Sequence, residues 1–139
     1  MDAIYRVDGN RVVTSPDAAG PWDSSMQHGS APAALVVWAA EAIPTPEPMR
    51  IARVTIDLMR PVPVAPLTFE TEVLREGRKI QLCAVRLRAA DVVVVAATVL
   101  KIRTQALSLP PDVADVAVTL LPGRIRPARS CRTFPAALS

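Results

Sequence analysis

The feature that most limits how this chain can fold is a predicted helix over residues 30–43 that has no polar face. Its sequence is SAPAALVVWAAEAI, in which Glu41 is the one charged residue. Ser30 can cap its start, Pro32 suits its first turn, and Pro44 stops it. Because a helix that is apolar on every side should be covered by protein, the rest of the chain is expected to wrap around it.

Residues 50–103 instead follow the alternation of polar and apolar side chains that is typical of β-strands. Val54, Ile56 and Leu58 alternate with polar residues, and the β-branched run at 92–102 suits a central strand. A long apolar helix followed by antiparallel strands predicts the α+β hot-dog fold, an antiparallel β-sheet wrapped around one long central α-helix. The predicted strands cover residues 53–59, 67–75, 80–88 and 92–102, and an Asp-Gly turn joins a short hairpin over residues 4–13.

The composition excludes several classes of protein. With 139 residues, 50% of them hydrophobic and 21% charged, the chain is expected to form one ordinary folded domain. Aromatic residues make up only 4%, which argues against binding single-stranded nucleic acid by base stacking. Two cysteines, Cys83 and Cys131, and one histidine suggest neither a disulfide scaffold nor a metal site. Cys83 is expected to be a buried structural thiol, and Cys131 an exposed one.

The sequence contains no segment that predicts a membrane span or an export signal. No apolar run reaches the roughly 20 residues that a bilayer span requires. The N-terminal sequence MDAIYRVDGN lacks the basic and then apolar pattern of a signal peptide. We therefore expect a cytoplasmic location.

The positive charge of the chain is concentrated in its last part. The net charge is +3, yet residues 1–100 hold ten Lys or Arg against eleven Asp or Glu. We therefore divide the chain into a hot-dog domain at 1–103 and a Pro-rich basic tail at 104–139. The tail is either a solvated end or attracts an anionic ligand such as a nucleotide phosphate. Duplex DNA binding is not expected, because no structured element carries a basic face. The arginines that give the tail most of its charge are Arg124, Arg126, Arg129 and Arg132.

The segment that enters the helix carries the one chemical signature in the sequence, Gln27-His28-Gly29-Ser30. A helix start presents unpaired backbone N–H groups and a partial positive charge, and Gly29 lets a ligand approach them closely. Such a site can hold a thioester carbonyl and stabilise the oxyanion that forms when water attacks. Gln27 and His28 can donate further hydrogen bonds or orient a water. The structural alternative is an ordinary loop in which Gly29 eases a turn and His28 caps the helix.

Three stretches give the chain a resemblance to the acyl-CoA thioesterase II (TesB-like) family. They are the His-Gly pair entering an Ala-rich helix, the strand ending in Arg60-Pro61-Val62, and EVLREGRKIQ at residues 72–81. The resemblance covers residues 1–103 and implies a hot-dog unit that acts on acyl-CoA. Family members resemble two such units fused in one chain, and residues 104–139 resemble the linker between them. The family's catalytic Asp, Thr and Gln lie in the second unit, so no position here corresponds to them.

Three carboxylates remain as candidates for a catalytic residue: Asp57, Glu41 and Asp23. Many single-unit hot-dog thioesterases carry a carboxylate about two turns into the helix, near the position where this chain has Val37 and Trp38. Glu41 lies one turn further on and is either a paired structural charge or a site residue. Asp57 lies on the outer face of its strand, where it meets solvent or a second subunit. Asp23 is a turn residue or orients a water.

The sequence and the resemblance together predict an acyl-CoA thioesterase of fatty acid metabolism. The acyl chain would lie in an apolar slot beside the helix, with its carbonyl at the backbone of Gly29 and Ser30. Coenzyme A enters as part of the substrate, and no other cofactor, metal or nucleic acid is expected. The alternative is a non-catalytic acyl-CoA-binding or structural unit, because the helix lacks the carboxylate. A hydratase or dehydratase is a third reading, but His28 has only Asp23 nearby in the sequence.

The predicted sheet also has a consequence for assembly. A single hot-dog sheet leaves an exposed strand edge, which is prone to pair with another strand. In the two-unit relatives, the resemblance implies that the halves pair into one continuous sheet. We therefore expect this chain to pair with a copy of itself as a two-fold homodimer.

Overall fold

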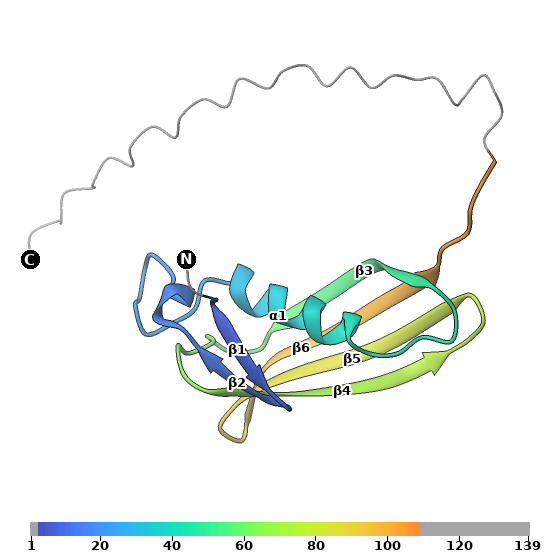
Figure 1. Ribbon diagram of the computed structural model, residues 1–139. Coiled ribbons are helices and arrows are strands. Elements are labelled where there is room, and N and C mark those ends of the chain that lie inside the picture. The colour runs from blue at the N-terminus through green and yellow to red at the C-terminus, as the bar shows by residue number, and fades with distance from the viewer. Residues whose placement is uncertain (1–2, 109–139) are drawn as a thin grey trace, which may run out of the picture. The chain divides into compact units, whose positions relative to one another are not determined.

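The computed structural model describes residues 3–108, in which the apolar segment forms helix α1, Ser30–Glu41 (Figure 1). Gly29 occupies the N-cap position without a side-chain cap, so the prediction that Ser30 caps the helix is wrong. Ser30 is already the first helical residue, and its hydroxyl group bonds to the His28 ring nitrogen Nδ1 over 2.7 Å. The helix ends at Glu41, whereas the sequence predicts an end two residues later, at Ile43.

Two side chains of the sheet bind the carbonyl groups that follow the helix. Pro44 has no N–H group and stops the helix before it. Lys101 Nζ donates to the carbonyl oxygen of Ile43 over 2.9 Å, and Gln81 Nε2 donates to that of Pro44 over 2.8 Å. Both side chains are buried, so these two donors take the place of the helical N–H groups that the chain cannot supply.

Six strands form one antiparallel sheet in the order β1-β2-β4-β5-β6-β3. Each strand that the sequence predicts is present, so the prediction of an antiparallel sheet with one central helix is confirmed. The turn between the last two strands includes Ala90 at a left-handed φ of 50°. The strands are β1 Tyr5–Asp8, β2 Arg11–Thr14, β3 Met49–Leu58, β4 Leu67–Glu76, β5 Ile80–Ala89 and β6 Val92–Arg103, and a 3₁₀ helix, η1, covers Pro16–Ala18.

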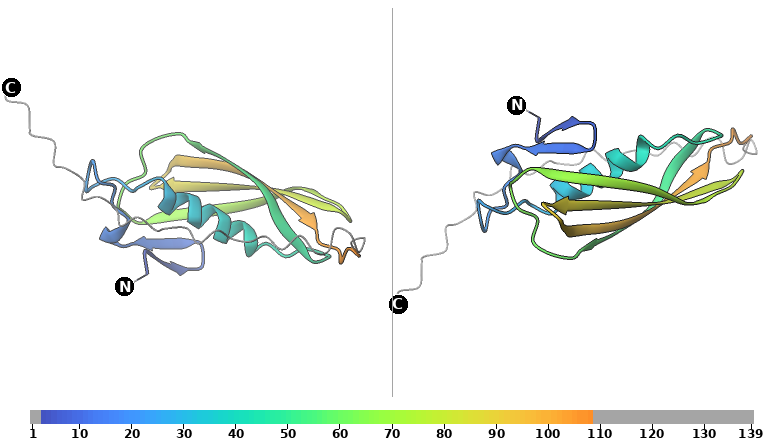
Figure 2. Two further views of the ribbon diagram at one scale, coloured as in Figure 1. Left: turned by 90° about the horizontal axis from the view of Figure 1, so that it is seen from above. Right: turned by 90° about the horizontal axis from the view of Figure 1, so that it is seen from below.

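Helix α1 lies across one face of strands β3 to β6, and the hairpin of β1 and β2 lies along one flank of the helix (Figure 2). The hairpin joins the sheet only where Arg11 and Val12 pair with residues of β4, which lets it turn toward the helix. Cys83 is fully buried in the core, as predicted. The core between helix and sheet contains Val12, Leu35, Val36, Ala39, Ala40, Val62, Leu67, Cys83, Val85, Leu87, Val94, Val95, Ala97 and Val99.

One side of α1 stays open, so the prediction that protein covers the helix all round is wrong for the described residues. Ala34, Trp38 and Glu41 follow one another at one-turn spacing and are all exposed. Trp38 is 47% exposed and keeps an edge-on contact with Phe69, with ring centroids 5.9 Å apart. The sheet and the hairpin reach two sides of the helix, and the third side presents Ala34, Trp38 and Glu41.

The described part of the chain ends shortly after the sheet. Strand β6 ends at Arg103, the predicted domain boundary, and the predicted tail lies outside the described residues from residue 109 onward. Its four arginines and Cys131 are therefore among the residues that the structure does not describe. Between residues 3 and 108, no helix combines the length and apolarity that spanning a membrane requires.

Candidate functional site

Gln27 fixes the loop that leads into α1. Its side-chain Oε1 accepts a hydrogen bond from the Tyr5 hydroxyl group, and its Nε2 donates to the carbonyl oxygen of Pro63 over 2.7 Å. Its backbone N–H donates to the carbonyl oxygen of Val62 over 2.8 Å. Because the buried amide is engaged at both of its polar atoms, Gln27 anchors the loop between β1 and the segment that follows β3.

His28 lies at the surface beside the helix start. The backbone N–H of Ser30 donates to its ring nitrogen Nδ1 over 3.3 Å. This nitrogen is therefore an acceptor, and the proton of the neutral ring is on Nε2. The ring stacks on Trp22, with centroids 6.1 Å apart and an interplanar angle of 11°. The arrangement leaves the Nε2–H group as a donor that is not used by the helix.

Gly29 provides the free backbone donor at this helix start. The Ala31 N–H donates to the carbonyl oxygen of His28 over 2.9 Å, and the Ser30 N–H is turned to the His28 ring. Within residues 3–108, no hydrogen bond from the Gly29 N–H to a protein acceptor is found. Its φ of −56° suits any residue, and an added Cβ would make an ordinary 3.7 Å contact with Leu58. The fold therefore does not require glycine here, whereas a ligand that approaches the backbone would.

A cavity of about 320 Å³ opens beside Gly29, between the start of α1 and the end of β3. Leu58 and Met59 form part of its wall and are 55% and 61% exposed. Arg60 is the one charged residue that lines it. An apolar cavity with few polar groups and a backbone donor is suited to an acyl chain that ends in a carbonyl. The lining consists of Met26, Gln27, Gly29, Pro32, Leu58, Met59, Arg60, Pro61 and Val62.

The three candidate carboxylates lie outside this cavity. Asp57 is exposed and alternates with Leu58, so its side chain projects from the opposite face of β3. Asp23 accepts hydrogen bonds from the Ser25 hydroxyl group over 2.6 Å and from the Ser25 N–H over 2.8 Å. These two bonds lower the pKa of the exposed Asp23 carboxyl. Glu41 is at the far end of α1, about 16 Å from the helix start.

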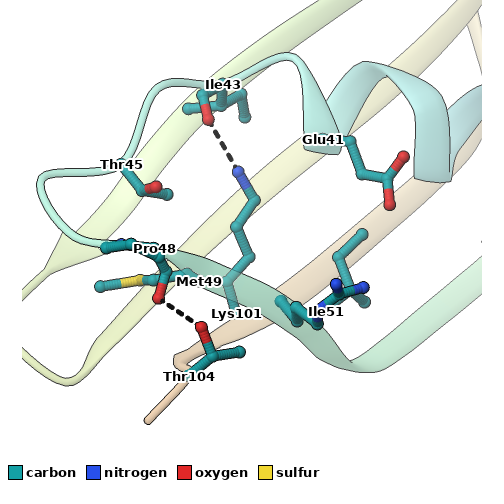
Figure 3. A pocket seen from close by; sticks show the side chains of 9 residues that line it. Glu41, Ile43, Thr45, Pro48, Met49, Ile51, Lys101 and Thr104 are labelled. Carbon is teal, nitrogen blue, oxygen red and sulfur yellow. Dashed lines mark hydrogen bonds between the residues drawn. The ribbon is translucent and has the colours of Figure 1, made fainter. Parts of the chain in front are cut away.

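A second cavity, of about 490 Å³, lies at the far end of α1 (Figure 3). We call it the Lys101 cavity, because the Lys101 side chain extends through it to the carbonyl oxygen of Ile43. Lys101 and Arg50 contribute two positive charges to its lining, and Glu41 contributes one negative charge. Among the described residues, neither cation forms an ion pair with a carboxylate. The lining consists of Glu41, Ile43, Thr45, Pro48, Met49, Arg50, Ile51, Lys101 and Thr104.

The Tyr5 hydroxyl group is expected to titrate above its ordinary range. Burial raises the pKa of Tyr5 from 10.0 to about 12. The neutral phenol therefore stabilises the fold at pH values below 10, and this contribution is lost as the pH rises from 10 to 12. We expect a loss of about 1 kcal/mol, less than the full shift would give, because part of the side chain faces water.

An absorbance titration of tyrosinate measures this shift directly, since Tyr5 is the single tyrosine in the sequence. The Tyr5→Phe variant supplies the baseline and should lose stability at neutral pH, because the Gln27 Oε1 then lacks its donor. A midpoint near pH 10 would contradict the buried contact between Tyr5 and Gln27.

Sequence reasoning did not identify Arg60 and Lys101, which line these cavities, or Tyr5, which bonds to Gln27. The sequence pattern places Tyr5 in a hairpin strand, Arg60 at the strand end that carries the family resemblance, and Lys101 in the interior of a strand. A lysine within the apolar run VVVVAATVLKI is the one signal that could have pointed to a buried charge. In residues 3–108, no three His, Cys, Asp or Glu side chains come together as metal ligands.

Comparisons with solved structures identify the fold. The chain is similar to a Bacillus halodurans protein crystallised with CoA, at 13% identity and a TM-score of 0.58, covering 74% of each chain. It is similar to the tesB protein of Mycobacterium avium subspecies paratuberculosis, at 24% identity and a TM-score of 0.56. A third likeness is to a hot-dog protein of unknown function from Alicyclobacillus acidocaldarius, at 21% identity and a TM-score of 0.60. These likenesses confirm the predicted hot-dog fold.

Two of these similar proteins are much longer than this chain. The similarity to the mycobacterial protein and to the Alicyclobacillus protein extends over 76% of this chain in each case. It covers only 41% of the mycobacterial protein and 40% of the Alicyclobacillus protein, because both are much longer. No curated protein matches the chain in sequence. The model of the acyl-CoA thioesterase N-terminal domain matches residues 18–102, which is more than half of the chain. This match confirms the resemblance drawn from the sequence, and the chain belongs to the family of acyl-CoA thioesterase N-terminal domains.

Proposed function

We propose that this protein binds acyl-CoA thioesters in the Gly29 cavity and hydrolyses them. The observation that carries the proposal is that Gly29, whose N–H group has no protein acceptor among the described residues, is one of the residues that line an apolar cavity. A thioester presents both an apolar chain and a carbonyl oxygen that needs a donor. Family membership and the CoA bound to the Bacillus halodurans relative support the same ligand class.

The proposed reaction places the acyl chain in the cavity and the carbonyl oxygen on the Gly29 N–H group. Water adds to the carbonyl carbon, and the backbone donor and the positive end of the helix stabilise the resulting oxyanion. The carbon–sulfur bond then breaks, so that the acid and the thiol of CoA leave, and the water supplies the proton that the sulfur takes. His28 can donate from Nε2 to the oxyanion or to the departing sulfur, because its Nδ1 is an acceptor.

A second candidate function is binding of acyl-CoA without turnover. It is favoured by one observation, namely that no carboxylate is among the residues that line the Gly29 cavity. Asp57, Asp23 and Glu41 each lie elsewhere in the chain, so the cavity contains no general base of the kind that often activates water.

A thiol-release assay over acyl-CoAs of increasing chain length, run beside thermal unfolding with the same ligands, separates the two functions. Hydrolysis that falls in the His28→Ala variant supports the proposed reaction. Thermal stabilisation without thiol release supports the binding function. A chain that neither releases thiol nor is stabilised by any acyl-CoA rules out both.

We also propose that the chain acts as a homodimer through β3. This strand is at an edge of the sheet, and its last residue, Leu58, is 55% exposed. Pairing with a second β3 would satisfy the free backbone groups and cover Leu58. Light scattering during size-exclusion chromatography at micromolar concentration should give twice the mass of the chain, and a monomeric mass would contradict the proposal.

A further inference from the structure

The sheet has an outer face, on the side away from α1, which the right-hand view of Figure 2 shows. Residues that pair directly across neighbouring antiparallel strands project from the same face of a sheet. Leu82 and Leu100 pair with each other, and they alternate along their strands with the buried core residues Cys83 and Val99. Because the core lies between the sheet and α1, both leucines project from the outer face.

Two adjacent rows of this outer face combine aliphatic side chains with arginines. They lie at the end of the sheet where β6 finishes, and they contain four aliphatic residues, three arginines and no acidic residue. The three arginines are exposed, and Ile102 is 43% exposed. We call this set the basic half of the outer face: Arg53, Leu100, Leu82 and Arg75 in one row, and Arg50, Ile102 and Ile80 in the other.

The rest of the outer face holds ion pairs. Arg86 Nη1 lies 3.2 Å from Glu72 Oε2, and Arg88 Nε lies 3.0 Å from Glu70 Oε1. Within residues 3–108 these are the two salt bridges found, so the arginines of the basic half have no carboxylate partner there. Residues 1–100 contain nearly equal numbers of basic and acidic residues, and strand pairing separates them. The prediction that no structured element carries a basic face is therefore wrong.

We propose that the basic half of the outer face binds the surface of a membrane that contains anionic lipids. Lipid phosphate oxygens would accept hydrogen bonds from the arginine guanidinium groups. The arginine stems and Ile102 would enter the boundary between the headgroups and the acyl chains, which gives the aliphatic part of the surface a partner as well. The Gly29 cavity takes no part in this contact, so the inference does not rest on the proposed function.

Other occupants match only part of this surface. Duplex or single-stranded nucleic acid would satisfy the arginines, but the basic half has no aromatic side chain on which bases could stack, and its aliphatic side chains would gain nothing. The basic half of a second copy would bring arginine against arginine. The polar half of a second copy offers Glu70 and Glu72, whose charges are already paired within the chain.

Cosedimentation of the full chain with lipid vesicles tests the charged part. Vesicles of equal parts phosphatidylglycerol and phosphatidylcholine should bind the chain about tenfold or more tighter than phosphatidylcholine alone, because each basic residue near an anionic surface contributes about fivefold. Arg53→Glu/Arg75→Glu should weaken this binding about a hundredfold or more. If charge reversal prevents folding, Arg53→Gln/Arg75→Gln should weaken it about tenfold or more.

The matched control is Arg6→Glu/Arg11→Glu, which changes the net charge equally at two exposed positions of the hairpin. It should weaken vesicle binding less than about tenfold, because salt screens charges that lie away from the contact. Equal losses in the two charge-reversed variants, or a wild-type chain that does not prefer the anionic vesicles, would overturn the proposal.

The predicted basic tail carries charge of the same sign, so its contribution is removed separately. In a chain whose tail arginines are replaced by glutamine, Arg53→Glu/Arg75→Glu should still weaken binding about a hundredfold. Vesicle binding that disappears with the tail arginines alone would overturn the assignment to the sheet. The replaced residues are Arg124, Arg126, Arg129 and Arg132.

The aliphatic part separates a lipid surface from other polyanions. Ile102→Thr should weaken binding to the anionic vesicles about three- to tenfold, because a half-exposed isoleucine loses its apolar contact. Val13→Thr, at a residue that is 48% exposed in β2, should leave that binding unchanged. Polyglutamate and duplex DNA should bind the wild-type chain more weakly than the vesicles do. If either polyanion binds as tightly, or if Ile102→Thr has no effect, the surface is a general anion or acidic-protein site and the proposal is overturned.

Discussion

Replacing Gly29 by proline is expected to lower kcat for acyl-CoA hydrolysis by about 10²–10³-fold, the range found when one oxyanion-hole donor is removed. The substitution deletes the N–H group that we propose holds the carbonyl oxygen. It should leave the fold intact, because the φ of −56° is one that proline adopts and no protein acceptor among the described residues uses this N–H. Steady-state kinetics with urea unfolding of the same samples separates the two effects.

Gly29→Ala is the matched control for that substitution. It keeps the N–H group and adds a Cβ that contacts only Leu58, at 3.7 Å, so its unfolding free energy should equal or slightly exceed that of the wild type. Its KM should rise more than its kcat falls, because the methyl group obstructs the approach of the substrate. Equal kcat values in the proline and alanine variants would show that the Gly29 N–H has no part in the reaction.

Leu87→Ala is expected to lower the free energy of unfolding by about 2–5 kcal/mol. Leu87 is fully buried in β5, an inner strand of the sheet, and belongs to the core between sheet and helix. Its truncation removes apolar contacts and leaves a cavity that the surrounding strands cannot close. Urea unfolding followed by circular dichroism gives the change.

Leu74→Ala provides the same chemical change at a site that is 46% exposed. It should alter the unfolding free energy by no more than about 0.5 kcal/mol, as is usual for surface positions. Similar losses in the two variants would mean that the core does not lie between β5 and α1.

Much of the fold follows from local patterns in the sequence. The apolar run that starts at Ser30 forms α1, and the alternation around Val54 and Ile56 forms β3, because burial imposes the periods of the helix and the strand. The exposed side of Trp38 could not be foreseen in the same way. Periodicity identifies an apolar helix, but it does not specify which of its sides the sheet covers.

The site was predictable only in part. The His28-Gly29 pair was identified because a helix start and a glycine are both visible in the local sequence. The anchoring role of Gln27 depends on Tyr5 and Pro63, which are 22 and 36 positions away. Lys101 binds a carbonyl group 58 positions away, so its role at the end of α1 follows from the antiparallel register and not from its neighbours.

The most direct test of the central claim is the amide signal of Gly29 in a protein labelled with ¹⁵N-glycine, whose spectrum contains five glycines at most. The ligand is an acyl-CoA ketone in which CH₂ replaces the thioester sulfur, so that the carbonyl is present but cannot be hydrolysed. We predict that the Gly29 proton signal moves downfield on binding, as expected for a new hydrogen bond to the ketone oxygen. Binding that leaves the Gly29 signal in place would contradict the account.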